Sequence, residues 1–501
     1  MRYEHVILVH PPSPPGFVAN RDSMGGFGQL FPAGATILPP LDLPYLAGYL
    51  AAENVSVSVL ECLGLGMGTE DLTRRVAAMA DETSGRALVA MRTSAPSLDW
   101  DLSVGTALKI ASPHIGLAVY GPVVPHVRAR LAREGSLDYI VSGEPDATVH
   151  ELAIGRPQEE ILGLSHRRDG AWFDAPPRPF LKELDRLPFP KWELLPYQRY
   201  TLPKSSATEP VPFLAMLTSR GCPFGCHYCP YPVGQGLPWR FRSPKNVVDE
   251  IEHLSNDLGI RYILFRDPMF SLRKDRAVEI CNEIQRRRLV FRWKCETRPD
   301  CMDEATARAM AAAGCDGINF GVESAEVGIQ KNVGRKPIAQ EAIVEMVETC
   351  RKVGIKTFCF FIVGLPGDTV HTVLSTIAFA IRLRPNWVQF TAASPFIGTK
   401  LRGWAIEQGL AREDDYSYIS SHQAIMGNEN LTQEQVARLL QFAQFFERYL
   451  INRGGILKDA NRKDALYGTA RAAADRISNL SARTILSLGR RHLERACATA
   501  P

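Results

Sequence analysis

The chain has 501 residues, of which 45% are hydrophobic and 22% charged, and this is typical of a soluble globular protein with two or three domains. Its formal net charge of +4 is small for the length and gives no reason to expect nucleic acid or an acidic membrane as partner. Its apolar runs are too short for a signal peptide or a membrane span, so we expect a cytoplasmic protein whose eleven cysteines are mostly thiols.

The first predicted domain, residues 1–155, alternates short β-type runs with segments whose apolar residues recur at helical spacing. This alternation predicts parallel strands joined by crossover helices, in a doubly wound, Rossmann-like sheet. Sheets of this type bind ligands in the loops after the strands, and those loops here are rich in glycine, proline and small polar residues. The predicted strands lie at 5–11, 55–62, 87–93, 115–121 and 137–143.

Residues 156–205 are rich in proline and lack a sustained period, which predicts an extended linker. A second alternating series occupies the predicted domain 206–404 and supplies six strand–helix units, fewer than the eight of a closed barrel. We therefore expect an α/β fold in which a partial (β/α)6 barrel follows the doubly wound domain. Residues 405–501 are predicted to be mostly helical and to cap the barrel over the substrate.

Three cysteines, Cys222, Cys226 and Cys229, follow the first predicted barrel strand in the stretch "GCPFGCHYC". A reducing location disfavours a disulfide. A structural zinc site requires four ligands, usually as two separated pairs, and the sequence has no second C-x2-C pair. An iron–sulfur cluster of four irons held by three thiolates fits better, because one iron then stays open to a substrate.

This C-x3-C-x2-C spacing, with Tyr228 before the third cysteine, resembles the signature of radical S-adenosylmethionine (SAM) enzymes, and the resemblance extends over about 211–400. It implies a [4Fe-4S] cluster on the three cysteines, which are then also the catalytic residues, and cleavage of SAM to a 5′-deoxyadenosyl radical. It also implies that further motif residues contact the cofactors: Tyr228, Asp267, Glu296, Arg298, Glu323, Ser324, Val363 and Gly364. Among these, Glu323 is expected at the ribose and Arg298 at the methionyl part of SAM.

The first domain, placed directly before such a barrel, resembles the cobalamin-binding subgroup of the family. The D-x-H-x-x-G signature of histidine-ligated cobalamin is absent, since none of the eleven histidines has an aspartate two places before it. His10 and His126, which stand beside prolines in turns, are expected to form hydrogen bonds in loops. The resemblance implies that loop residues line the cobalamin: Arg92, Thr93, Ser94, Ser97, Gly121, Pro122, Val123, Gly143 and Glu144.

The resemblance implies a C-methyltransferase that uses SAM both to methylate cobalamin, giving methylcobalamin, and to make the radical. The expected substrate is a small molecule of natural-product biosynthesis, such as an antibiotic precursor, methylated at an unactivated centre. The expected electron donor is external, a flavodoxin or ferredoxin, and the expected state is a monomer with no nucleic-acid or membrane partner. Two alternatives remain: a cobalamin-dependent radical SAM cyclase or rearrangement enzyme, and a non-enzymatic zinc-binding scaffold.

Overall fold

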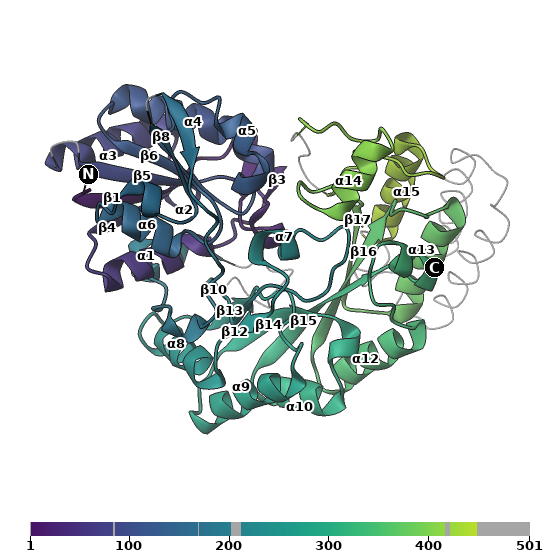
Figure 1. Cartoon of the computed structure of the whole chain (residues 1–501). Coiled ribbons are helices and arrows are strands. Elements are labelled where there is room, and N and C mark those ends of the chain that lie inside the picture. Colours follow the sequence, from purple (N-terminus) through teal and green to yellow (C-terminus); the bar gives the residue numbers. More distant parts are fainter. Residues whose placement is uncertain (1, 84–85, 169, 202–211, 416–420, 448–501) are drawn as a thin grey trace. The chain divides into compact units, whose positions relative to one another are not determined.

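The computed structural model describes residues 2–83, 86–168, 170–201, 212–415 and 421–447 (Figure 1). Contacts divide the chain into two compact units, Met1–Pro223 with Cys229–Pro268, and Phe224–Tyr228 with Met269–Pro501. Among the described residues, no helix is both long and apolar enough to cross a bilayer.

A seven-stranded sheet forms the core of the first unit, with the strand order β4-β1-β5-β6-β7-β8-β9. Five strands pair in parallel: β1 (His5–His10), β4 (Val57–Glu61), β5 (Ala87–Arg92), β6 (Gly116–Tyr120) and β7 (Tyr139–Val141). All residues of β5 and β6 are buried, as expected of parallel strands covered on both faces. The chain places β4 on one side of β1 and the next strand, β5, on the other side. This change of direction creates a topological switch point at the carboxyl ends of β1 and β5.

Helices cover both faces of this sheet, as the doubly wound prediction requires (Figure 1). Two helices pack together as one pair, α1 (Asp42–Ala52) and α6 (Pro145–Ala153), and another two as a second pair, α3 (Thr69–Glu82) and α4 (Leu98–Ala111). Shorter elements connect the strands: β2 (Phe17–Asn20), β3 (Gln29–Pro32), α2 (Cys62–Leu65) and α5 (Arg128–Leu131).

The segment expected to be a linker contributes two strands to the same sheet. Strands β8 (Leu164–Arg168) and β9 (Ala171–Asp174) extend it antiparallel, with Tyr139 of β7 paired to His166. Hydrogen bonds to β7 fix this hairpin, so this part of the segment is extended chain that belongs to the sheet. The sequence carries a signal for it, because Gly170 stands between two strand-like runs and glycine is favoured in hairpin turns.

The second series of strands forms a six-stranded sheet in sequential order, β10-β13-β14-β15-β16-β17. The first unit contains the parallel pair β10 (Phe213–Met216) and β13 (Tyr262–Phe265), together with the short pair β11 (Ser219–Arg220) and β12 (Arg240–Phe241). The second unit contains four parallel strands: β14 (Arg292–Thr297), β15 (Cys315–Glu323), β16 (Lys356–Val363) and β17 (Trp387–Ala392).

Helices alternate with these strands, which confirms the predicted α/β class. Ser243 caps α8 through its hydroxyl, Thr369 caps α13 in a capping box, and Asp303 caps α10. Two helices of this series belong to the first unit, α7 (Tyr231–Gln235) and α8 (Pro244–Asn256). The others are α9 (Lys274–Arg286), α10 (Glu304–Ala312), α11 (Val327–Asn332), α12 (Gln340–Lys352), α13 (Val370–Leu383), α14 (Lys400–Glu407) and α15 (Gln433–Phe446).

The C-terminal region is helical where the structure describes it, through α14 and α15. Its remainder, residues 448–501, lies outside the described residues, as do 416–420. The predicted boundaries 1–155, 156–205, 206–404 and 405–501 stay a prediction.

Candidate functional site

The cysteine loop, Gly221–Cys229, begins directly after the β11 strand. Cys222 is buried, whereas Cys226 and Cys229 are partly exposed. The Cys222 N–H donates to the carbonyl of Gly236 at 3.1 Å, so the return of the chain after α7 holds the first cysteine. Gly221 has φ +85°, and a Cβ there would lie 2.3 Å from the carbonyl oxygen of Pro238, so the position requires glycine.

The structure leaves the role of the three cysteines as a prediction. Among the described residues, no group of three His, Cys, Asp or Glu side chains is arranged to hold a metal ion. The loop is also divided between the two compact units, since Phe224–Tyr228 belongs to the second unit and the flanking Cys222 and Cys229 belong to the first. The donor set itself suits an iron–sulfur cluster, because three closely spaced thiols can hold three of its corners.

Asp267, expected at a cofactor, uses its carboxylate to anchor the start of the cysteine loop. One oxygen accepts the Thr218 N–H at 2.7 Å, and the other accepts the hydroxyls of Thr218 at 2.5 Å and Ser219 at 2.6 Å. Asp267 is fully buried at the end of β13. Its contacts therefore make it an anchor for the residues that precede Cys222.

In the second unit, Arg335 links two of the predicted residues. Its Nη1 donates to the Tyr228 hydroxyl at 3.2 Å, and the same nitrogen lies 3.7 Å from the Glu323 carboxylate. Its Nη2 donates to the Gly321 carbonyl at 2.5 Å, whereas its buried Nε has no partner among the described residues. Burial raises the pKa of Glu323, and Arg335 acts in the opposite direction. Glu323 and Tyr228 thus share one buried cation.

Sequence reasoning missed Arg335. It follows Gly334 after α11, where no pattern predicts burial, and nothing short of the tertiary contacts identifies it. The His227 N–H donates to the Val333 carbonyl at 2.8 Å, so the middle of the cysteine loop packs on the turn that carries Arg335. The same arginine lies close enough to Cys226 for that thiol to raise its pKa. A cation beside a metal-binding thiolate is favourable.

Arg298 contacts the same loop, and its expected place at the methionyl part of SAM stays a prediction. Its guanidinium stands 4.6 Å from the ring centroid of Phe224, and its Nη2 donates to the Lys336 carbonyl at 2.8 Å. Asp300 holds the guanidinium through two hydrogen bonds, and Nη1 is buried without a partner in the described part of the chain. Glu296 accepts a long hydrogen bond of 3.4 Å from Asn319 on the neighbouring strand.

The Val363–Gly364 turn after β16 is held by Asp368. Gly364 has φ +86°, and its N–H and that of Leu365 both donate to the Asp368 carboxylate at 3.0 Å. A Cβ at Gly364 would lie 2.7 Å from Val436, so helix α15 packs directly on this turn. Ser324, the last of the predicted SAM residues, is buried with its hydroxyl 3.3 Å from that of Thr376. Its contacts in the structure are therefore internal.

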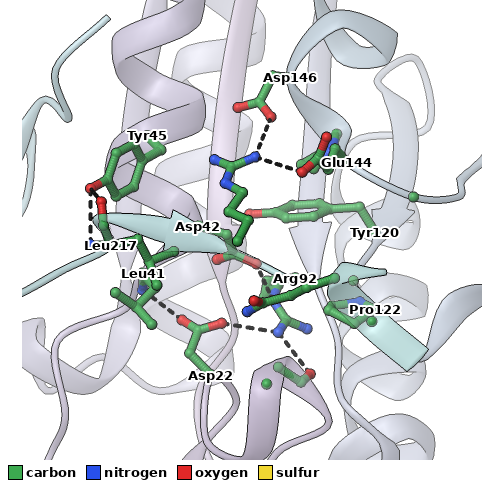
Figure 2. Close-up of a pocket in the computed structure, with 18 of the residues that line it drawn as sticks. Asp22, Leu41, Asp42, Tyr45, Arg92, Tyr120, Pro122, Glu144, Asp146 and Leu217 are labelled. Carbon is green, nitrogen blue, oxygen red and sulfur yellow. Dashed lines mark hydrogen bonds and ion pairs between the residues drawn. The ribbon is translucent and has the colours of Figure 1, made fainter. Parts of the chain in front are cut away.

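Arg92, predicted to face cobalamin, is the centre of a buried ion network at the end of β5 (Figure 2). It pairs with Asp22 at 2.9 Å and with Asp42, and its Nη2 donates to the carbonyls of Arg21 at 3.1 Å and Gly26 at 2.9 Å. Burial acts against the charge, but the two carboxylates outweigh it and raise the pKa of Arg92. Arg92 thus ties the segment Arg21–Gly28 to the sheet edge.

The neighbouring predicted residues bind the same segment. Thr93 and Ser97 donate their hydroxyls to Asp101, which also pairs with the buried Arg21. The Ser94 hydroxyl bonds that of Ser97 at 2.7 Å, and a Cβ at Gly28 would lie 2.4 Å from it. These side chains are therefore satisfied within the protein, and what they support is the glycine-rich segment Arg21–Gly28, which sequence reasoning missed.

The other predicted loop residues gather at one pocket of about 100 Å³ at the edge of the sheet (Figure 2). Gly121, Pro122, Gly143 and Glu144 line it with Arg92, whereas Val123 is fully buried and is not among the lining residues. Burial would raise the pKa of Glu144, but Arg220 and Arg240, at 3.0 and 2.8 Å, hold it below the usual value.

The histidine expectation is confirmed for His10. Its Nδ1 lies 3.1 Å from the carboxylate of Glu61, which also accepts the Tyr200 hydroxyl at 2.7 Å. Both His10 and Glu61 are buried at the ends of neighbouring strands. His126 lies in a short 3-10 helix, Val124–His126, and burial lowers its pKa.

Comparison with known proteins places these features in a family. The radical SAM superfamily matches residues 216–380. An uncharacterized methyltransferase of Pyrococcus horikoshii is 32% identical over 410 residues, which cover 81% of this chain and 86% of that protein. The anaerobic magnesium-protoporphyrin IX monomethyl ester cyclase of Rubrivivax gelatinosus is 25% identical over 70% of this chain and 64% of its own length.

Two solved structures share the fold. The radical SAM methyltransferase TsrM of Kitasatospora setae, solved with cobalamin and a [4Fe-4S] cluster, has a TM-score of 0.64 at 21% identity, covering 81% of this chain and 75% of that protein. The cobalamin-dependent SAM radical enzyme OxsB, solved with aqua-cobalamin and SAM, has a TM-score of 0.70 at 14% identity, covering 98% and 75%. At these identities the likeness shows the fold.

Proposed function

Because the chain belongs to the radical SAM superfamily, we propose that this enzyme is a cobalamin-dependent methyltransferase acting on a small molecule. The observation that carries the proposal is the fold match to OxsB over 98% of the chain, which includes the doubly wound sheet as well as the barrel strands. The methyltransferase of Pyrococcus horikoshii, matched over 81% of the chain, supports the reaction type. Family membership disfavours the zinc-scaffold alternative.

The residues present suit the cofactors. Cys222, Cys226 and Cys229 would hold a [4Fe-4S] cluster, because they are closely spaced in the sequence of one loop and Arg335 places a positive charge near Cys226. The orphaned nitrogens of Arg298 and Arg335 would bind the anionic end of SAM, since a buried donor without a partner favours an acceptor. When bound, the cluster supplies the electron that splits SAM, and cobalamin supplies the methyl group.

The protein's own contribution is to position and enclose the reacting groups. Asp267 holds Thr218 just before the cysteine loop, and Gly236 holds Cys222 at its start. Arg335 holds the loop further along through Tyr228. Asp368 holds the backbone turn at Gly364, with α15 packed over it. These contacts fix the backbone on either side of the partly exposed Cys226 and Cys229, so the loop is positioned before a cofactor binds.

Anaerobic reconstitution tests the cluster. We expect roughly four irons per chain in the wild type and loss of iron and of 5′-deoxyadenosine formation in Cys226→Ala. Cys350→Ala is the matched control, because Cys350 is buried in α12 and burial raises its pKa to about 12, so it should keep the iron. Normal 5′-deoxyadenosine formation by Cys226→Ala would refute the ligand assignment.

The products distinguish methyl transfer from the second candidate, a cyclase or rearrangement, which the similarity to the Rubrivivax cyclase favours. Methyl transfer should yield S-adenosylhomocysteine together with 5′-deoxyadenosine from SAM. A cyclase should yield 5′-deoxyadenosine alone. We propose a natural-product precursor as substrate and a flavodoxin or ferredoxin as electron donor, and assays with each reduced donor test the second point.

A further inference from the structure

Tyr120 presents an unsatisfied hydroxyl to the pocket at the sheet edge (Figure 2). It is the last residue of β6, and its side chain is fully buried. Among the described residues, its hydroxyl has no hydrogen-bond partner. Leaving a buried hydroxyl unpaired is unfavourable, so a partner supplied by a ligand is favourable.

Asp42 presents an unsatisfied oxygen to the same pocket. It is the first residue of α1, and Arg92 binds its Oδ2. The other oxygen, Oδ1, is buried and has no partner in the described part of the chain. Arg92 therefore orients the carboxylate so that one oxygen remains for a donor from the pocket.

The protonation states of the two groups make them a donor and an acceptor. Burial raises the pKa of Tyr120 well above its usual value, and Asp42 adds to the rise, so the phenol keeps its proton and donates. Burial raises the pKa of Asp42 to about 6 despite Arg92, so the carboxylate is ionised at neutral pH and accepts. Both residues line the same pocket, and the Asp42 carboxylate is one of the charges that raise the pKa of Tyr120.

The space beside them suits a small polar group. The pocket of about 100 Å³ has room for a group several times larger than one water molecule. Glycines form much of its wall: Gly25, Gly26, Gly121 and Gly143, the first three of which leave no room for a Cβ beside Tyr231, Pro122 or Arg92. Gly143 has open space where a Cβ would lie, so a ligand group can approach the backbone closely at that residue.

A donor beside an acceptor complements a primary carboxamide, whose oxygen accepts while its NH2 donates. A carboxylate would instead meet the negative charge of Asp42. We propose that Tyr120 and Asp42 bind a primary carboxamide in this pocket, and that it is one of the carboxamides around the corrin ring of cobalamin. The inference rests on the proposed function, which supplies cobalamin as the ligand, and it assigns Tyr120 and Asp42 to recognition of its periphery.

Tyr120→Phe tests the donor. We expect the Kd for hydroxocobalamin, measured from the change in its visible spectrum on addition of protein, to rise about fivefold to tenfold, the effect of one lost hydrogen bond. Tyr139→Phe is the matched control, because Tyr139 lies on the adjacent strand with its hydroxyl bonded to Tyr3 and away from the pocket. The control should bind as the wild type does.

Ligand analogues test Asp42 as the acceptor. They are measured with the wild-type protein, so the result does not depend on whether a variant folds. Cobalamin monocarboxylates, in which one carboxamide is an acid, should include an isomer that binds the wild type at least about tenfold more weakly than cobalamin. Asp42→Asn should reduce the difference in Kd between cobalamin and that monocarboxylate. A wild type that does not bind cobalamin overturns the proposed cofactor and this inference with it. If Tyr120→Phe leaves the Kd for hydroxocobalamin unchanged, this inference alone is overturned. The same holds if the wild type binds every monocarboxylate as tightly as cobalamin.

Discussion

Asp368 shows how one residue of the SAM-motif turn depends on its surroundings. It is buried, and its carboxylate accepts two backbone N–H groups and the Thr372 hydroxyl. Burial nevertheless outweighs these bonds and raises its pKa from 3.8 to about 7. The folded protein therefore keeps this proton up to about pH 7, whereas the unfolded chain releases it near pH 4. Stability contributed by this group is full below pH 4 and is lost as the pH rises to 7.

Asp368→Asn should make stability less dependent on pH in that window, because asparagine cannot lose the proton. The melting temperature of the wild type should fall relative to that of the variant between pH 4 and pH 8, by the equivalent of a few kcal/mol for a shift of this size. The loss of one hydrogen-bond acceptor in the variant should lower its melting temperature equally at pH 4 and at pH 8. It therefore does not change the slope of melting temperature against pH. Asp275→Asn, at an exposed position, is the control. Parallel pH profiles for wild type and Asp368→Asn would contradict the raised pKa.

At the scale of elements, a residue that follows a neighbouring strand, and not a residue of the loop itself, anchors the start of the cysteine loop. Asp267 at the end of β13 anchors Thr218 and Ser219 between β10 and the loop, where β10 and β13 run parallel in register from Phe213 to Met216. The carboxyl ends of parallel strands meet at one edge of a sheet, so a side chain after one strand can hold the loop after the next. The loop conformation thus depends on a contact 49 residues away in sequence.

Asp267→Asn should weaken cluster retention without removing a thiol. An amide accepts at only one oxygen, so at least one of the three hydrogen bonds to Thr218 and Ser219 is lost. After reconstitution and gel filtration, we expect iron content to fall severalfold and partial recovery with excess iron and sulfide. Asp257→Asn is the control, because Asp257 is exposed just after α8 and bonds the half-buried His253. Iron content equal to wild type in Asp267→Asn would show that the anchor is dispensable.

At the scale of the whole molecule, the contact pattern joins the doubly wound sheet to the first two barrel strands in one compact unit. Glu144, at the end of β7, bridges to Arg220 and Arg240 on the β11–β12 pair and accepts the Leu181 N–H. These ion pairs are largely buried, and breaking one leaves uncompensated charge. Glu144 thus connects the N-terminal sheet to the segment that carries Cys222.

Glu144→Gln should destabilise the first unit by about 3 kcal/mol at neutral pH, the usual effect of removing one partner of a buried pair. Because the folded pKa of Glu144 lies below 4.5, the carboxylate's contribution is present above that pH and is lost as the pH falls through the folded value. The difference from wild type should therefore shrink in acid, as measured by thermal melting at several pH values. Glu70→Gln, an exposed residue of α3, should melt as wild type.

The sequence determined the features that depend on local pattern. Strand–helix alternation predicted both parallel series, because the periods of 2 and 3.6 residues are properties of neighbouring residues. The spacing of Cys222, Cys226 and Cys229 predicted the iron–sulfur chemistry for the same reason, since one short loop carries all three ligands. Loop residues such as Arg92, Gly121 and Glu144 could be named because parallel strands bring their carboxyl ends to one edge.

Only the tertiary structure decided how those residues are used. Arg92 is paired with Asp22 and Asp42, 70 and 50 residues earlier, and Arg335 reaches Tyr228, 107 residues earlier. No periodicity links such positions, because burial and ion pairing between distant segments depend on how the chain packs rather than on adjacent residues. For that reason the sequence identified the cysteines and the sheet edge, whereas the structure showed that Arg335 holds the cysteine loop and that Tyr120 and Asp42 face the pocket.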